Sequence, residues 1–397
     1  MQPQAVLVTV TGPDRPGVTS ALFAALAAYD VEVVDVEQVV IRGRLVLCVL
    51  LALRGEPAPL RRAVTKTAQA LGVEVEIGVG DEVDDAMPNR AGRHHVLMLG
   101  SPLRAGAVSE VASRIAELGA NIDSIGRLSN YPVTSLELMV SGADSTELRT
   151  TLAVAAAEAN IDIAVERAGL HRRAKRLLVM DVDSTLVQGE IIEMLAEHAG
   201  CADQVARVTE ATMAGELDFT ESLRARVALL AGLPESVLDE VRAKLRLMPG
   251  ARTLIRTLKR MGYRCGVVSG GFTQFTDDLV RVLGLDFAAA NTLEIADGRL
   301  TGRLSGEIID RPGKARALVH FAGRFEIPLT QTVAVGDGAN DIDMLNTAGL
   351  GVAFNAKAAV CDAADASLSQ PYLDAILFLL GISRDEVEQA DGDDSTL

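Results

Sequence analysis

A short apolar run that ends in two carboxylates constrains the fold of this chain more than any other feature. Leu177–Met180 is apolar at every position, as expected for a strand buried on both faces of a parallel sheet. Asp181 and Asp183 follow, where the strand should run out into a loop. Residues two apart on a strand point the same way, so both carboxylates can serve one site. The pair alone also fits a strand end that is merely polar, so a functional site requires further polar residues elsewhere in the chain.

Three later stretches repeat this arrangement. They place polar residues at expected strand ends or helix starts: Ser269 and Gly270 after Arg264–Val268, Lys314 in Arg311–Lys314, and Asp337 with Asn340 and Asp341 after Thr332–Val335. A hydroxyl with free N–H groups suits an anion, and a lysine adds positive charge. Ligands of open parallel sheets bind at the carboxyl ends of the strands, so one site is expected there.

Strands and helical patterns alternate from Arg176 onward, which predicts an α/β domain with a Rossmann-like parallel sheet at residues 171–383. A further strand is expected at Gly351–Phe354, and a strand pair at Asn291–Ile309 that turns at Asp297-Gly298. Residues from about 190 to 247 are nearly all helical in pattern. An insertion of helices after a catalytic strand predicts a cap over its site. The acidic residues 384–397 predict a frayed tail.

The first part of the chain contains an internal repeat. Three turn positions recur at a constant offset of 89 residues: Pro13 and Pro102, Arg15 and Arg104, Gly17 and Gly106. Each turn lies between an apolar strand and a helical pattern, and two strands, a second helix and a last strand follow. This order predicts two ferredoxin-like βαββαβ domains, at residues 1–85 and 86–170.

The two copies resemble the ACT domain, a sensing module that commonly binds amino acids. A glycine at the turn lets the backbone approach a ligand, and helix N–H groups suit a carboxylate. The resemblance therefore implies an effector site at Gly17 and Gly106, with Asn121 of the second copy as a further hydrogen-bonding group. The first copy has Glu32 in place of that asparagine. A purely structural or dimerising pair is the alternative.

Residues 175–380 resemble the haloacid dehalogenase superfamily of phosphohydrolases and carry all four of its motifs in order. Within the superfamily, three stretches are similar to the phosphoserine phosphatase family: Asp181–Val187 with Glu190, Phe219–Val227, and Ser269–Phe272. The resemblance implies Mg²⁺-dependent hydrolysis of O-phospho-L-serine to L-serine and phosphate, the last step of serine biosynthesis, through an aspartyl phosphate.

The same resemblance implies roles for the catalytic residues. Asp181 would attack phosphorus, and Asp183 would act as general acid and then general base. The Mg²⁺ ligands would be Asp181, the main-chain carbonyl of Asp183 and Asp337. Asp341 and Asn340 would support the waters of the ion.

Residues around the substrate also receive roles from the resemblance. Lys314, Ser269 and Gly270 would grip the phosphoryl oxygens. Glu190 would pair with the substrate ammonium and Arg226 with its α-carboxylate. Met213 and Phe219 would exclude water. Glu190 and Arg226 can also be read as ordinary charged residues on helices.

Composition excludes some classes of partner and indicates a cellular compartment. A net charge of −16 argues against a nucleic-acid partner, because phosphate backbones require basic patches. The longest apolar run, Leu45–Leu53, is too short to span a membrane. Four scattered cysteines and an N-terminus without a basic leader predict a cytoplasmic protein. We expect a homodimer, with L-serine as product and effector.

Two other function classes fit parts of the sequence. A phosphotransferase could pass the aspartyl phosphate to an alcohol such as homoserine. A ligand-sensing regulator could carry a silent catalytic domain, but the intact set of Asp181, Asp183, Lys314 and Asp337 disfavours it.

Overall fold

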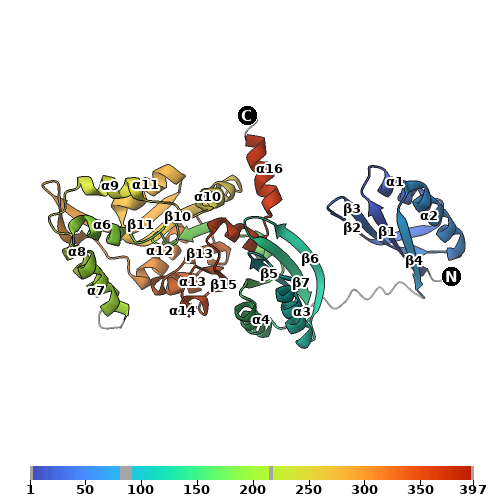
Figure 1. The fold of residues 1–397 in the computed structure, drawn as a ribbon, viewed down its shortest axis with the longest axis horizontal. Helices are drawn as coiled ribbons and strands as arrows, with labels where there is room; N and C mark the ends of the chain where they lie inside the picture. Colours follow the sequence, from blue (N-terminus) through green and yellow to red (C-terminus); the bar gives the residue numbers. More distant parts are fainter. Residues whose placement is uncertain (1–2, 81–91, 214–217, 395–397) are drawn as a thin grey trace. The chain divides into compact units, whose positions relative to one another are not determined.

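The computed structural model describes residues 3–80, 92–213 and 218–394, and the chain forms two compact units, Met1–Asn89 and Arg90–Leu397 (Figure 1). The first unit has the order β1 (Gln4–Pro13), α1 (Val18–Leu26), β2 (Val31–Ile41), β3 (Arg44–Leu53), α2 (Pro57–Leu71) and β4 (Glu74–Gly80). Its antiparallel sheet has the strand order β2-β3-β1-β4. Val6, Val8 and Val10 alternate along β1 and are buried with the apolar residues of the two helices. The expected ferredoxin-like fold is confirmed.

The second unit begins with the same topology. Its elements are β5 (His94–Gly100), α3 (Ala105–Glu117), β6 (Asn121–Ser129), β7 (Thr134–Ser141), α4 (Ser145–Ala159) and β8 (Asp162–Arg167). The strand order β8-β5-β7-β6 matches that of the first repeat. Here the sheet continues, because Ala164 of β8 pairs antiparallel with Ala366 of β15 (Ala366–Leu368). The result is one sheet of eleven strands across the repeat and the α/β domain.

The α/β domain is built around β9 (Leu177–Met180), which lies between two parallel neighbours, β10 (Arg264–Phe272) and β13 (Thr332–Gly336). Beyond them lie β11 (Phe287–Ala296), β12 (Arg299–Ser305), β14 (Gly351–Phe354) and β15. Leu178 and Met180 are buried in one core cluster, and Leu177 and Val179 in another. The prediction of a strand buried on both faces is therefore confirmed.

Helices cover both faces of this sheet. Figure 1 shows α10 (Ala251–Arg260) and α11 (Thr273–Leu283) on one side, and α12 (Arg311–Arg324) and α13 (Ile342–Thr347) on the other. The shorter helices are α5 (Leu170–Arg173), α14 (Ala358–Cys361) and α15 (Ile376–Leu379). Strands β11 and β12 form the expected hairpin, because Asp297 and Gly298 both have positive φ.

Helices are also inserted after β9. They are α6 (Ile191–Ala199), α7 (Ala202–Met213), α8 (Phe219–Ala228) and α9 (Ser236–Lys244). A capping box between Asp218 and Glu221 starts α8. This region is the helical cap that the sequence predicts.

The prediction of a frayed tail is wrong for residues 384–394, which form α16 (Arg384–Asp394). Val387 is buried in the core of the α/β domain, and Asp391 pairs with Arg256 and Arg260 on α10. A buried valine, the two ion pairs of Asp391 and a third between Arg384 and Asp374 hold a segment whose acidic composition predicts disorder. Among the helices of the described residues, none combines the length and the apolar character that crossing a membrane requires.

Candidate active site

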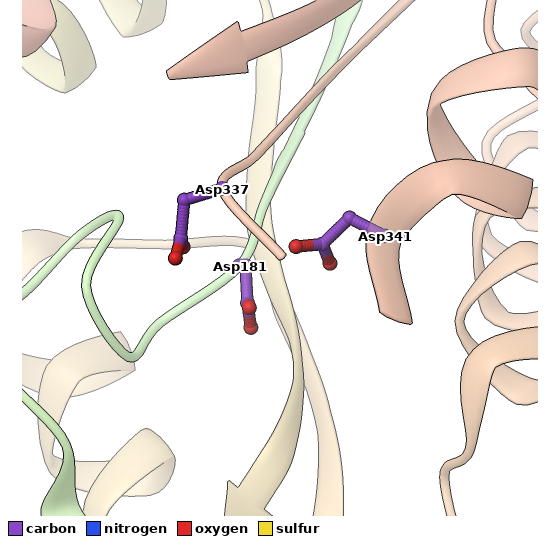
Figure 2. Close-up of side chains that lie close together, drawn as sticks. All are labelled: Asp181, Asp337 and Asp341. Atoms are coloured by element: carbon purple, nitrogen blue, oxygen red, sulfur yellow. The ribbon is translucent and has the colours of Figure 1, made fainter. Parts of the chain in front are cut away.

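Three carboxylates meet at the carboxyl end of the central strands. Asp181 follows β9, Asp337 follows β13, and Asp341 ends the short helical turn Ala339–Asp341. Figure 2 shows the three side chains together, and their oxygens lie within 4.8 Å of one another. The Asp181 N–H donates to the Val335 carbonyl at 2.9 Å, which ties the start of the first loop to β13.

A buried lysine joins two of these carboxylates. Lys314 Nζ lies 2.8 Å from Asp181 Oδ2 and 2.7 Å from Asp341 Oδ1, and the lysine is fully buried. Burial alone would lower the pKa of Lys314, but the two carboxylates outweigh it and raise the pKa. Burial and repulsion from Asp341 hold the pKa of Asp181 well above its usual value. Such crowded, desolvated carboxylates are suited to a divalent cation.

The second carboxylate of the first loop has a different environment. Asp183 Oδ1 accepts the Ile191 N–H at 2.8 Å. Burial, and then repulsion from Glu190, raise the pKa of Asp183 to about 7. A carboxyl with this pKa carries its proton in a large fraction of molecules near neutral pH, as a general acid must.

The expected phosphoryl-binding residues lie at the end of β10. Ser269 is buried, and its Oγ accepts the Gly271 N–H at 2.8 Å. A Cβ on Gly270 would lie 2.9 Å from the Phe219 ring, so the missing side chain lets the cap reach this turn. A Cβ on Gly338 would lie 2.2 Å from Asn340 Oδ1, so Asn340 packs against the loop after β13.

The cap supplies charged groups to the same site. Glu190 Oε1 accepts the Ser184 hydroxyl at 2.9 Å. Burial lowers the pKa of Arg226, while the negative charges of Glu190 and Asp183 act in the opposite direction. Arg226 Nε is buried and has no hydrogen-bond partner among the described residues, so it is available to a ligand. Met213 ends α7, and its side chain lies outside the described part of the chain.

Two residues of the site were not singled out from the sequence. Thr185 is fully buried, and its hydroxyl donates to Asp337 Oδ1 at 2.6 Å. Burial nevertheless raises the pKa of Asp337 to about 6. Thr185 belongs to the Asp181–Val187 stretch, so a hydroxyl beside two carboxylates was a usable signal. Asn291 hydrogen-bonds Gly270 from β11, and no local pattern pointed to it.

The expected effector residues have three different local environments. Gly106 lies in the first turn of α3 and lines a cavity of about 710 Å³ together with Ser101, Arg104, Asn160 and Gln370. Asn121 is not part of that lining, and its side chain donates to Asp123 Oδ1 at 3.0 Å. Gly17, with φ of 99°, precedes α1 in the other unit.

Known proteins match nearly the whole chain. Residues 178–346 match the haloacid dehalogenase-like hydrolase family, and residues 4–78 and 92–166 match ACT domain families. Phosphoserine phosphatase of Streptomyces coelicolor is 61% identical, over 97% of this chain and 94% of that protein. Phosphoserine phosphatase SerB2 of Mycobacterium tuberculosis is 57% identical, over 98% and 96%.

A solved structure agrees with these matches. The unliganded crystal structure of a probable phosphoserine phosphatase from Vibrio cholerae covers 74% of this chain and 88% of its own, with a TM-score of 0.58 and 34% identity. The identity to the two curated relatives extends over both repeats and the α/β domain. This chain therefore belongs to the phosphoserine phosphatase family, within the haloacid dehalogenase-like hydrolases.

Proposed function

We propose that this chain hydrolyses O-phospho-L-serine to L-serine and phosphate through an aspartyl phosphate on Asp181. The observation that carries the proposal is the buried pair of Asp181 and Lys314 beside a carboxyl, Asp183, with a pKa of about 7. A nucleophile, a fixed positive charge and a proton donor thus meet at one strand end. The cap adds Arg226 and Glu190, whose charges complement the carboxylate and ammonium of phosphoserine.

The metal of this site is proposed to be Mg²⁺. Asp181, Asp337 and Asp341 offer a hard, all-oxygen donor set, which Mg²⁺ prefers over softer ligands. The family resemblance implies the main-chain carbonyl of Asp183 as a further ligand beside Asp181 and Asp337, with Asp341 supporting the waters of the ion. The bound cation would supply positive charge to the phosphoryl oxygens and offset repulsion between carboxylate and phosphate.

Asp181 and Asp183, the two aspartates of the first loop, carry out the covalent and proton-transfer steps. A carboxylate oxygen of Asp181 bonds to phosphorus as the bond from phosphorus to the serine oxygen breaks. Asp183 gives its proton to that departing oxygen. It then takes a proton from the water that attacks phosphorus, so phosphate leaves and the Asp181 carboxylate is restored. Lys314 holds Asp181 in place throughout and balances the charge.

A phosphate-release assay over a panel of phosphorylated metabolites tests the proposal. Phosphoserine should be the best substrate, EDTA should abolish turnover and Mg²⁺ should restore it. Asp181→Asn should lower kcat by about 1000-fold or more, because the attacking charge is lost. Activity of that variant within tenfold of the parent would refute the assignment. Product analysis with added homoserine separates hydrolysis from phosphotransfer.

The substrate clamp has its own test. Arg226→Ala should lower kcat/KM for phosphoserine by about 100-fold, and p-nitrophenyl phosphate, which lacks a carboxylate, should be affected far less. Arg224→Ala is the matched control, because Arg224 lies exposed on the same helix. Equal losses on both substrates would mean that Arg226 does not bind the α-carboxylate.

We further propose that the ACT repeats bind L-serine and restrain the phosphatase. The cavity beside Gly106 supports this, and a Cβ on Gly106 would meet open space, so Gly106→Asp should fold normally. This variant should relieve serine inhibition by about 5-fold or more with uninhibited turnover intact. If serine inhibits the parent and Gly106→Asp equally, the effect is product inhibition at the active site.

A cytoplasmic homodimer completes the proposal. Edge strand β2 exposes a series of apolar side chains: Val33, Val34, Val36, Val39, Val40 and Ile41. A long apolar edge invites pairing, so a second copy is its expected partner. Mass measurement by light scattering tests this, and a monomer at micromolar concentration would contradict it. The four cysteines are free thiols, which favours a reducing compartment.

A further inference from the structure

Asn291 occupies a gap in the sheet beside the phosphoryl-binding turn. Strand β10 pairs regularly with β11 up to Val268 and again at Phe272, which lies opposite Asn291. Between these points the register shifts, and the regular pairing of the two strands skips Gly270. The side chain of Asn291 reaches across this gap, because its Nδ2 donates to Gly270 O at 2.8 Å. Asn291 itself is 1% exposed.

This hydrogen bond fixes one peptide plane. In a trans peptide the carbonyl and the N–H point in opposite directions, so holding the Gly270 carbonyl also aims the Gly271 N–H. That N–H donates to Ser269 Oγ at 2.8 Å. A hydroxyl that accepts this bond keeps its own hydrogen for another acceptor. The Ser269 O–H can therefore donate to a phosphoryl oxygen of a bound substrate.

The other end of the amide reaches the segment that carries Lys314. Asn291 Oδ1 accepts the Ile309 N–H at 2.8 Å. Asp310 follows and caps α12, since its Oδ1 accepts the Gly313 N–H at 2.7 Å. Lys314 lies in the first turn of that helix. One buried amide therefore joins the Ser269 turn to the start of the lysine helix.

We propose that Asn291 is a positioning residue that sets the two phosphoryl-binding groups, Ser269 and Lys314, relative to each other. The inference rests on the proposed phosphatase function and deepens it. Both polar atoms of the amide are engaged, one as donor and one as acceptor. A carboxylate of the same size keeps the acceptor but loses the donor. Asn291→Asp therefore breaks the bond to Gly270 and spares the bond to Ile309.

A matched control lies on the neighbouring helix. Gln274 bridges α11 to the same strand, because its Nε2 donates to Leu293 O at 2.9 Å and its Oε1 accepts the Leu293 N–H at 3.3 Å. Gln274→Glu makes the same chemical change away from the Ser269 turn. Full-length protein with Mg²⁺ would be measured for kcat, KM, inhibition by inorganic phosphate and melting temperature. Phosphoserine and p-nitrophenyl phosphate would both serve as substrates.

Asn291→Asp should lower kcat/KM by about 100-fold on both substrates, the loss typical of one misplaced transition-state donor, and weaken phosphate inhibition to a similar degree. Gln274→Glu should keep kcat/KM within about threefold of the parent, even if its melting temperature falls as much as that of Asn291→Asp. Kinetics of Asn291→Asp that match this control would show a structural role only and overturn the proposal. A loss confined to phosphoserine would also overturn it, because the phosphoryl group is common to both substrates.

A second variant covers a failure of Asn291→Asp to fold. Asn291→Ala removes both bonds without adding charge and should lose at least as much kcat/KM on both substrates. Retention of kcat/KM within about threefold in this variant would overturn the proposal. If the parent hydrolyses p-nitrophenyl phosphate but not phosphoserine, the proposed substrate is wrong, and the Asn291 comparison is still decided with the synthetic substrate.

Discussion

The two N-terminal repeats share one topology but differ in the sheet face that their helices do not cover. This face is exposed in the first repeat and buried in the second. In the first repeat that face carries Leu7 of β1, which is 45% exposed. In the second repeat the same face carries Leu97 of β5, which is 2% exposed because it packs in the core of the α/β domain. Thr9 and Leu99, two residues further along each strand, show the same contrast in polarity.

Polar contacts also join the second repeat to the α/β domain. Arg172, buried at the junction, donates to the carbonyls of Phe378 and Leu379 at 3.1 and 2.9 Å and pairs with Glu137 and Glu166 of the repeat. The core of the first repeat is filled by its own residues alone within the described part of the chain. A shared topology therefore does not make two domains equally independent, since the residues of the open face decide that.

Deletion tests this comparison most strongly. Removal of residues 1–89 should leave the melting temperature of the remaining unit and its kcat nearly unchanged. Removal of residues 1–168 should abolish soluble, active protein, because it uncovers the core that Leu97, Leu99 and Ala164 close. Circular dichroism melting and phosphate release would measure both. An active, stable 169–397 fragment would show that the α/β domain does not depend on the second repeat.

The next largest effect is expected at the junction arginine. Arg172→Ala should cost about 3 kcal/mol of unfolding free energy, because Glu166 and two carbonyls lose a buried partner. Arg149→Ala is the control: its ion pair with Asp365 also spans the junction but is exposed, so the cost should stay below about 1 kcal/mol. Urea unfolding would separate the two, and equal costs would contradict a buried anchor at Arg172.

Truncation of one leucine on each of these two sheet faces gives a smaller but more direct contrast. Leu97→Ala should cost about 2–3 kcal/mol, as for a cavity in a packed core. Leu7→Ala should change stability by less than about 0.5 kcal/mol, because that side chain already meets water. Differential scanning calorimetry of the full chain would follow both units. A large loss for Leu7→Ala would show that its sheet face is covered in the assembled protein.

A buried carboxyl at the junction should give the smallest, pH-dependent effect. Burial raises the pKa of Asp162, although its Oδ2 accepts the Ser369 N–H at 2.9 Å. Its contribution to stability is therefore present below the unfolded-state pKa and lost as pH rises through the folded-state pKa. Asp162→Asn, which cannot ionise, should raise the melting temperature by roughly 2 °C at pH 7.5 and by nothing at pH 4. Glu74→Gln, exposed at the start of β4, is the control and should show no such dependence.

Local pattern was enough to predict much of the active-site framework. The strand Leu177–Met180 was predicted with the bounds it has, and the Asp297-Gly298 hairpin was placed correctly. Asp181 and Asp337 follow apolar runs, and parallel strands bring their carboxyl ends to one edge. The frayed-tail prediction failed because it used acidic composition and could not include the buried Val387.

The amino-acid sequence was enough to predict which residues end the strands, that the N-terminal part is a repeat, and what chemistry the polar loops can support. These features depend on neighbours a few residues apart, where periodicity and turn chemistry act. Three contacts could be seen only in the folded chain: β8 pairs with β15, Arg172 reaches carbonyls more than 200 residues away, and Asn291 holds Gly270. Such contacts depend on which surfaces meet after the chain collapses. Burial and charge crowding then set the pKa of Asp183 and of Asp337, because both require neighbours that only the folded chain brings together.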